Sequence, residues 1–379
     1  MSARRSNGPG IATRVFGSQW FVSVLAVLIA FAIGAILIAL SGASVLDAYY
    51  AMFRGSIVDP NASTFVRQIK PLTDSLFYSI PLIISGLGLG LGFRAGLFNI
   101  GGKGQIIVGA LAAVWVGFAV NLPPVLHTLV ALLVAVIAGG LYAGIAGVLK
   151  AKTGANEVIV TIMLNSIATL GLGYTLAQKA WQVPGTNQPV TPKVAESAAL
   201  ARLLPAPFKL HVGFLVALVA LVAFWWLIER STLGFQIRAV GANAAAARTA
   251  GISVERITAI TMVLSGAFLG LAGANEALGT IGYVSRDVAG SIGFDAITVA
   301  LLGRNKTWGT FGAGLLFGAF KAGGYTMQAK GVPIDMILIL QSVIVLLIAA
   351  PALVRWLFRL PDVRALAANT RKENADEHK

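Results

Sequence analysis

The chain has 379 residues, of which 57% are hydrophobic and only 12% are charged, with three histidines and no cysteine. This composition excludes an ordinary soluble domain, and the lack of cysteine excludes disulfide frameworks and thiolate metal sites. The formal net charge of +14 is typical of a membrane protein with basic cytoplasmic loops and needs no nucleic-acid partner. The sequence therefore predicts an all-α polytopic membrane bundle.

Ten apolar segments are candidates for crossing the membrane, because a helix needs about 20 mostly apolar residues to do so. They are residues 20–40, 72–93, 104–121, 125–149, 158–177, 212–228, 257–278, 288–302, 308–320 and 334–353. The eighth and ninth are short and flank the polar tip "GRNKT". With ten segments both termini lie on the same side of the membrane, and most Lys and Arg of the loops lie on that side too. The positive-inside rule therefore places both termini in the cytoplasm.

The domain organisation follows from these segments. We expect a cytoplasmic N-terminal segment over residues 1–19, a transmembrane domain over 20–354 and a largely disordered cytoplasmic tail over 355–379. The long outer loop, residues 178–211, is rich in proline and is predicted to be irregular. A loop of this length indicates either a contact surface or a passive connector.

A short cytoplasmic helix is predicted within residues 230–256. Asn243 can cap a helix that begins at Ala244, and Gly251 can end it with Ile252 folding back as in a Schellman motif. A helix of about two turns is marginal in water by itself. Its presence favours a docking partner, and a solvated connecting loop is the alternative.

The stretch "GFRAGLFNIGGKGQ", residues 92–105, interrupts two apolar runs with five glycines. Irregular backbone at membrane depth is tolerated only where protein or a water-filled cavity satisfies it. The stretch therefore indicates a re-entrant turn beside a path, with the ring of Phe98 and the amide of Asn99 as candidate contacts. The alternative is a cytoplasmic hairpin in which Arg94 and Lys103 only determine topology.

Two further groups of polar residues lie at membrane depth. Glu157, Thr161, Asn165 and Thr169 recur every four residues, which places them along one helical face. Hydrogen bonding between helices explains Thr161 and Thr169 equally well, whereas Asn165 favours a path. Glu276 is an ionisable group that either lines a path or lies at the outer interface.

Four stretches together resemble a known family. They are "LGLGFRAGLFNIGGKGQ", "GANEVIVTIMLNSIA", "LGFQIRAVGANAAAARTAGI" and "ITVALLGRNKTWGTFGAGLLFGA". The chain is similar to permease subunits of ATP-binding cassette importers in the branched-chain amino acid, ribose and nucleoside group, and most similar to nucleoside and simple-sugar permeases. Lys103 departs from this pattern, because relatives often carry Glu at the matching position.

The resemblance implies a type II-like importer permease for nucleosides in the cell (inner) membrane. Residues 230–256 would then dock on a cytoplasmic ATPase, which holds ATP-Mg, while this chain carries no cofactor. The implied ATPase-coupling residues are Arg238, Gly241, Asn243, Ala246, Ala247, Gly251 and Ile252. The implied substrate-pathway residues are Phe98, Asn99, Thr161, Asn165 and Glu276. The other implied partners are a second permease chain, different from this one, an extracytoplasmic substrate-binding lipoprotein and the lipid bilayer.

Other functions remain open at this point. The sequence has no G-x-x-x-x-G-K-[ST] motif, so we expect a transport subunit rather than an enzyme. A ribose or simple-sugar permease of the same architecture is the nearest alternative. An ion-coupled secondary transporter belongs to another class, for which inverted repeats would be expected; the sequence shows no clear internal repeat.

Overall fold

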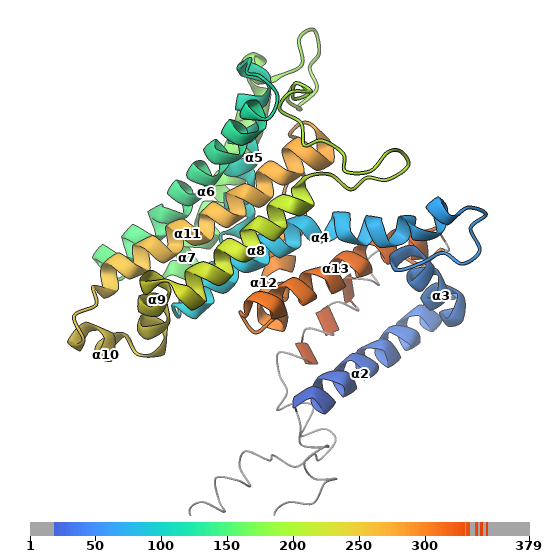
Figure 1. Cartoon of the computed structure of the whole chain (residues 1–379), viewed down its shortest axis with the longest axis horizontal. Helices are drawn as coiled ribbons and strands as arrows, with labels where there is room; N and C mark the ends of the chain where they lie inside the picture. Colours follow the sequence, from blue (N-terminus) through green and yellow to red (C-terminus); the bar gives the residue numbers. More distant parts are fainter. Residues whose placement is uncertain (1–18, 330, 334–337, 340–341, 344–345, 348–379) are drawn as a thin grey trace, which may run out of the picture. The chain divides into compact units, whose positions relative to one another are not determined.

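The computed structural model describes residues 19–329, 331–333, 338–339, 342–343 and 346–347 (Figure 1). Within these residues the chain is helical, and its one β-bridge, between Arg202 and His211, is isolated. The helices are α2 (Gln19–Leu40), α3 (Val45–Ser56), α4 (Phe65–Arg94), α5 (Gly102–Ala119), α6 (Leu126–Thr153), α7 (Glu157–Ala177), α8 (Gly213–Arg230), α9 (Thr232–Ala242), α10 (Ala244–Thr249), α11 (Val254–Asn275), α12 (Ile292–Leu302) and α13 (Thr307–Gln328), with single turns η1 (Lys179–Trp181) and η2 (Glu276–Ile281). The all-α prediction is confirmed.

Six helices of the described part are long and apolar enough to cross a membrane. They are α4, α5, α6, α7, α8 and α11 with its continuation into η2. The predicted eighth segment, 288–302, forms only the 11-residue helix α12, which extends about 16 Å, or half of the hydrocarbon layer. The predicted tenth segment lies largely outside the described residues, so ten spans and the orientation of the termini stay predictions.

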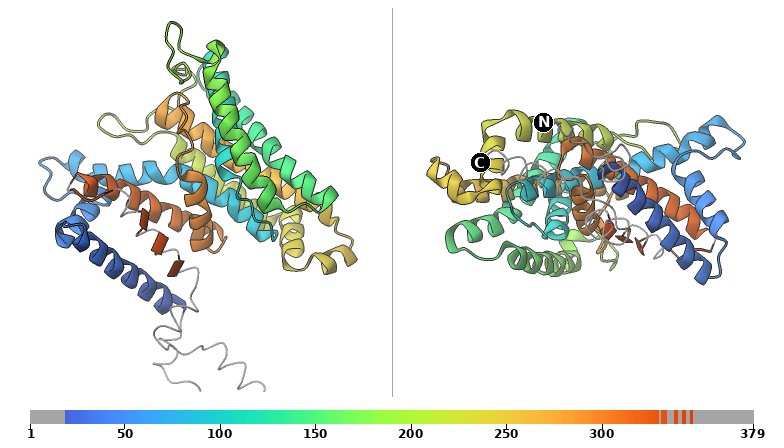
Figure 2. Two further views of the ribbon diagram at one scale, coloured as in Figure 1. Left: turned by 180° about the vertical axis from the view of Figure 1, so that it is seen from behind. Right: turned by 90° about the horizontal axis from the view of Figure 1, so that it is seen from below.

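The described residues divide into two compact units. Met52–Thr326 forms the larger unit, and the smaller combines residues of Met1–Ala51 and Met327–Lys379. In the larger unit α11 packs against α6, α5 and α4, and its close pairing with α6 is visible in two orientations (Figures 1 and 2). The burial of α4 shows that it lies inside the unit. In its most apolar stretch of 18 residues 83% of the residues are buried, against 22% in the corresponding stretch of α7.

Glycines allow α6 and α11 to touch through their backbones. A Cβ added at Gly266 would lie 2.3 Å from the carbonyl oxygen of Gly139, and one added at Gly270 would lie 2.2 Å from that of Ala135. Small residues permit such close approach. The resulting van der Waals packing drives helix association in a membrane, where lipid provides no hydrophobic driving force between helices. This contact accounts for the close pairing of α6 and α11.

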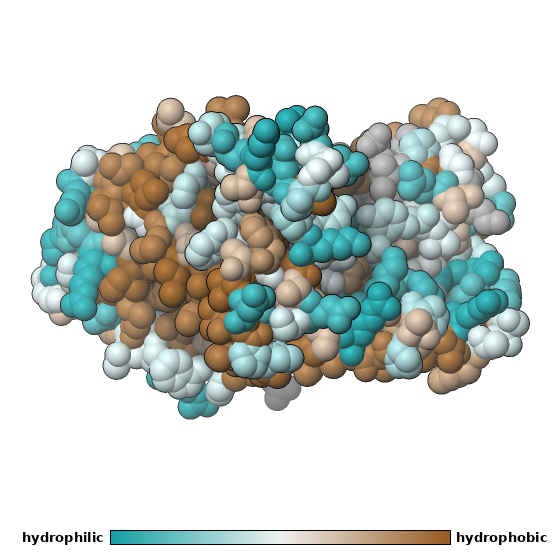
Figure 3. All heavy atoms as spheres, turned by 90° about the horizontal axis from the view of Figure 1, so that it is seen from above, coloured by the Kyte–Doolittle hydropathy of each residue, from teal (hydrophilic) through white to brown (hydrophobic). Residues whose placement is uncertain are grey.

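Apolar side chains cover the outer faces of α6 and α7. On α6, Leu129, Leu133, Ile137 and Leu141 are exposed at four-residue spacing, which aligns them along one face of the helix. Figure 3 shows a broad hydrophobic area on one face of the molecule. Such a surface suits lipid or another membrane subunit.

The loop of residues 178–211, which is predicted to lie on the outer side, is irregular apart from the single turn η1, as predicted. Hydrogen bonds nevertheless attach it to η2 and to the residues that follow η2. The N–H of Thr191 donates to the carbonyl oxygen of Val284 over 3.0 Å, and the N–H of Leu200 donates to that of Leu278 over 3.0 Å. The loop therefore has a defined path along the bundle.

Candidate functional site

The segment predicted to couple the chain to an ATPase contains two helices, α9 and α10. The Asn243 side chain accepts a hydrogen bond from the N–H of Ala246 over 3.0 Å and so caps α10. At the other end Gly251 has a φ of 84°. The N–H of Ile252 donates to the carbonyl oxygen of Ala247 and that of Gly251 to Arg248, both over 3.0 Å. These are the two bonds of a Schellman motif, so the predicted short helix and its caps are confirmed.

Sequence reasoning missed α9. The helix begins after Ser231, whose hydroxyl accepts from the N–H of Gly234 over 2.9 Å, and this N-cap residue was the available signal. Between α9 and α10 lies a hollow of about 570 Å³. Phe235 on its wall is 61% exposed, and Ala246 is exposed beside it, whereas Ala247 is buried. The two helices thus present an open surface with one large apolar side chain.

Gly241 joins this segment to the membrane bundle. A Cβ at Gly241 would lie 2.0 Å from the carbonyl oxygen of Arg94, so the end of α9 rests directly on the turn after α4. Arg94 in turn donates from Nε to the carbonyl oxygen of Asn305 over 2.8 Å, at the tip between α12 and α13. Arg238 is half-buried on α9. The segment of α9 and α10, the end of α4 and the tip are therefore in contiguous contact.

The predicted re-entrant turn is an ordered irregular segment, residues 95–101, between α4 and α5. The Asn99 side chain at its centre is fully buried. Its Nδ2 donates to the Gln105 side chain over 3.0 Å and to the Ser265 hydroxyl on α11 over 2.9 Å. Its Oδ1 accepts from the N–H of Gly101 over 3.0 Å. Asn99 thus holds the segment in shape, and its contact with substrate stays a prediction.

The polar face of α7 binds the backbone of this segment. The Glu157 carboxylate accepts from the N–H of Phe98 over 3.4 Å, and the Thr161 hydroxyl accepts from the N–H of Ile100 over 3.3 Å. The Asn165 side chain accepts from the N–H of Gly104 over 2.8 Å and donates to the Ile100 carbonyl over 2.9 Å. The polar side chains that recur every four residues on α7 therefore satisfy the backbone hydrogen-bonding groups of this segment inside the bundle.

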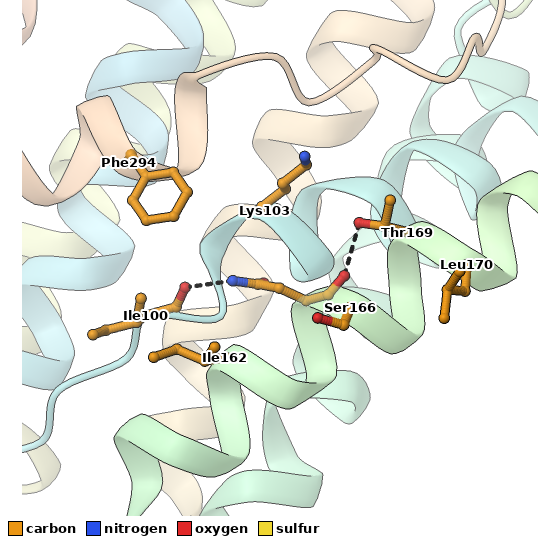
Figure 4. Close-up of a pocket in the computed structure, with 8 residues that line it drawn as sticks. Ile100, Lys103, Ile162, Ser166, Thr169, Leu170 and Phe294 are labelled. Atoms are coloured by element: carbon orange, nitrogen blue, oxygen red, sulfur yellow. Dashed lines mark hydrogen bonds between the residues drawn. The ribbon is translucent and has the colours of Figure 1, made fainter.

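A hollow of about 520 Å³ opens beside this polar face of α7 (Figure 4). Its lining combines apolar, hydroxyl, amide and ammonium groups from the start of α5, from α7 and from α12. The lining residues are Ile100, Lys103, Ile162, Asn165, Ser166, Thr169, Leu170 and Phe294. Asn165 is the predicted pathway residue that lines it. Ser166 was not selected from the sequence, although it directly follows Asn165 of the polar face of α7. No sequence signal indicated Phe294.

The remaining predicted pathway residues lie elsewhere. Phe98 is half exposed and packs on Phe93 with ring centroids 4.7 Å apart, outside the lining of this hollow. Glu276 begins η2, beyond the end of α11, and accepts from the Thr280 hydroxyl over 3.4 Å. The structure thus brings Phe98, Asn99, Thr161 and Asn165 together around residues 95–104 and leaves Glu276 apart. No cluster of His, Asp or Glu suited to a metal ion occurs among the described residues.

A helical bundle with long apolar spans, an irregular segment held by buried polar groups and an exposed capped helix is typical of a multi-pass membrane protein. Residues 72–349 match the profile of the branched-chain amino acid transport system / permease component family, and the chain belongs to this family. It is therefore an integral membrane protein and a transport component.

Similar proteins align over almost the whole chain. The guanosine ABC transporter permease protein NupP of Bacillus subtilis is 39% identical, over 89% of this chain and 95% of its own length. The glucose ABC transporter permease protein TsgB13 of Haloferax volcanii is 36% identical over 85% of each chain. The nucleoside ABC transporter permease protein NupB of Lactococcus lactis is 30% identical over 92% of this chain and 95% of its own. No solved structure matches the chain significantly.

Proposed function

We propose that the chain is the transmembrane subunit of an ATP-driven importer and forms part of the translocation path for nucleosides. The observation that carries this proposal is the near full-length similarity to permeases of guanosine and nucleoside transporters. The similarity to a glucose permease makes a simple sugar the second candidate. Membership of the permease family gives no support to an ion-coupled secondary carrier.

The coupling role rests on the segment of α9 and α10. We infer that its exposed surface, with Phe235 and Ala246, docks on a cytoplasmic ATPase that binds ATP-Mg. Arg238, Asn243, Ala247, Gly251 and Ile252 shape or flank this surface. When the ATPase pair closes, the segment moves with it, and Gly241 transmits the movement to the end of α4. The bundle then alternates between inward and outward access.

The other partners follow from the same proposal. A second permease chain, different from this one, completes the path, and a substrate-binding lipoprotein delivers the nucleoside at the outer side, to which the positive-inside rule assigns residues 178–211. Thr161 and Asn165 of α7 border the path together with Phe98 and Asn99 of the irregular segment. Glu276 is proposed as a polar group nearer its outer end.

Substitutions at Gly251 test the coupling role. Gly251→Pro is incompatible with a φ of 84°, because proline fixes φ near −65°, whereas Gly251→Asn tolerates the left-handed region. We expect Gly251→Pro to abolish nucleoside uptake and transport-coupled ATPase activity, with normal membrane insertion, and Gly251→Asn to retain both activities.

A bulky side chain tests the docking surface itself. Ala246→Trp should block uptake because Ala246 is exposed on the surface of α10, whereas a large residue at buried Ala247 would also disturb folding. Ala119→Trp, at an exposed position at the far end of α5, is the control and should retain uptake. Full uptake by Gly251→Pro and Ala246→Trp would refute docking through this segment.

A further inference from the structure

The hollow at the start of α5 gathers groups that suit one kind of ligand. It offers one ammonium group (Lys103), one aromatic ring (Phe294), two hydroxyl groups (Ser166 and Thr169) and one amide (Asn165) on an otherwise apolar lining. Its volume of about 520 Å³ lies within the range of small-molecule sites. This combination of a ring, a cation and hydroxyls matches a flat ligand that carries both a polar edge and a sugar.

Lys103 is the charged group of this hollow and is only partly buried. Among the described residues no carboxylate lies within ion-pair distance of its Nζ. It stands in the first turn of α5, where the helix dipole adds positive potential. The hollow therefore attracts hydrogen-bond acceptors and disfavours a ligand edge that presents donors.

The start of α12, which carries Phe294, touches the start of α5, which carries Lys103. A Cβ at Gly293 would lie 2.5 Å from the backbone nitrogen of Lys103, so the starts of α12 and α5 touch. The ring of Phe294 is 57% exposed. In the view of Figure 4 Lys103 lies between this ring and the side of the hollow formed by Thr169. An exposed ring in a cavity is a platform on which a base can stack.

The two hydroxyl groups lie on α7. Thr169 donates to the carbonyl oxygen of Asn165 over 2.8 Å, so its oxygen still has the capacity to accept. Ser166 is exposed one residue after Asn165. Both groups can therefore bond ribose hydroxyls while a base occupies the side of Phe294.

We propose that this hollow is the specificity site for a 6-oxopurine nucleoside, whose base stacks on Phe294 while Lys103 donates to the O6 and N7 acceptors. Guanine presents these two acceptors on one edge, whereas adenine replaces O6 with an N6 amino donor. The ammonium group of Lys103 can only donate, so it discriminates against the amino base. This inference rests on the proposed nucleoside transport.

The test is maximal uptake of radiolabelled guanosine and adenosine by the complete importer, at concentrations that saturate the binding protein. Lys103→Met removes the donor and the charge at similar length. We expect the guanosine-to-adenosine ratio to fall about tenfold, within the range for loss of a bidentate base contact. Lys103→Arg should keep the preference. Phe294→Ala should slow both substrates, and Phe294→Tyr should restore them.

Matched controls separate the site from general damage. Lys152→Met and Phe65→Ala change exposed residues outside the hollow and should leave rates and ratio unchanged, with uptake normalised to the amount of importer in the membrane. An unchanged ratio in Lys103→Met, with active nucleoside uptake, would overturn the specificity site and leave the proposed function standing. Lack of nucleoside uptake by the unmodified importer would overturn the proposed function itself.

Discussion

Arg94 donates a hydrogen bond from Nε to the backbone carbonyl oxygen of Asn305 over 2.8 Å. This bond joins the end of α4 to the tip between α12 and α13, whose residues Arg304 and Asn305 both have a φ of 54°. The carbonyl oxygen of Arg94 also packs against Gly241 of α9. One residue thus connects the segment of α9 and α10 with the tip, and movement of α9 would act on both.

Loss of this connection should weaken the bundle. Arg94→Ala leaves the Asn305 carbonyl without its donor, and we expect the free energy of unfolding to fall by about 1–2 kcal/mol. Thermal unfolding in detergent, followed by tryptophan fluorescence, measures the change. Lys152→Ala, at an exposed position, is the control. An equal melting temperature for Arg94→Ala and the unmodified chain would show that the bond contributes nothing.

The glycine contact between α6 and α11 predicts a sharp difference between two alanine substitutions. Gly270→Ala would place a methyl group 2.2 Å from the carbonyl oxygen of Ala135, whereas a Cβ at Gly171 of α7 meets nothing within 4 Å. We expect Gly270→Ala to destabilise the protein by about 1–3 kcal/mol through overpacking and Gly171→Ala to be neutral or slightly stabilising. Similar melting temperatures for the two variants would contradict the close backbone contact.

The buried amide of Asn99 predicts a large loss on truncation. Asn99→Ala leaves the Ser265 hydroxyl, the Gln105 side chain and the N–H of Gly101 without a partner. Each unsatisfied buried group costs about 1–3 kcal/mol, so the variant should lose most of its folded population in detergent extracts. Size-exclusion chromatography of the solubilised protein measures this. Asn121→Ala, at an exposed site, should elute unchanged, and a monodisperse Asn99→Ala would refute the structural role.

His211 predicts a pH dependence of stability. It precedes α8, it is buried, its Nδ1 accepts from the N–H of Gly213 over 3.0 Å, and burial lowers its pKa from 6.5 to about 4. Between these values the unfolded chain takes up a proton before the folded one does, so the contribution is complete above pH 6.5 and is lost as the pH falls towards 4. The total loss is about 3 kcal/mol.

The variant His211→Asn removes this titration. Its melting temperature should fall less between about pH 7 and about pH 4.5 than that of the unmodified chain, because its side chain stays neutral throughout this range. Parallel curves for the two proteins would show that His211 titrates alike in the folded and unfolded states.

The parts of the fold that could be predicted are those fixed by local chemistry. Asn243 and Gly251 indicate the ends of α10, because an N-cap side chain and a left-handed glycine cap backbone groups within a few residues of themselves. The four-residue spacing of Glu157, Thr161 and Asn165 places them on one face of α7, because the period of the helix is also a local property of the chain. Composition also predicts the apolar spans.

Contacts between distant segments could not be predicted. Asn99 reaches Ser265 across 166 positions of sequence, and no local pattern indicates that pairing. The same limit applies to Phe294, which enters the hollow only because Gly293 lets α12 touch α5. Apolar composition also fails to separate a full span from the half-length α12, because both consist mainly of apolar residues.

The most direct test of the central claim is uptake of radiolabelled guanosine, uridine and ribose by cells that lack this gene, with and without the intact protein restored. Loss and rescue of nucleoside uptake, with ribose uptake unchanged, is the result that nucleoside import predicts. Loss and rescue of ribose uptake alone would contradict it and would assign the permease to simple sugars.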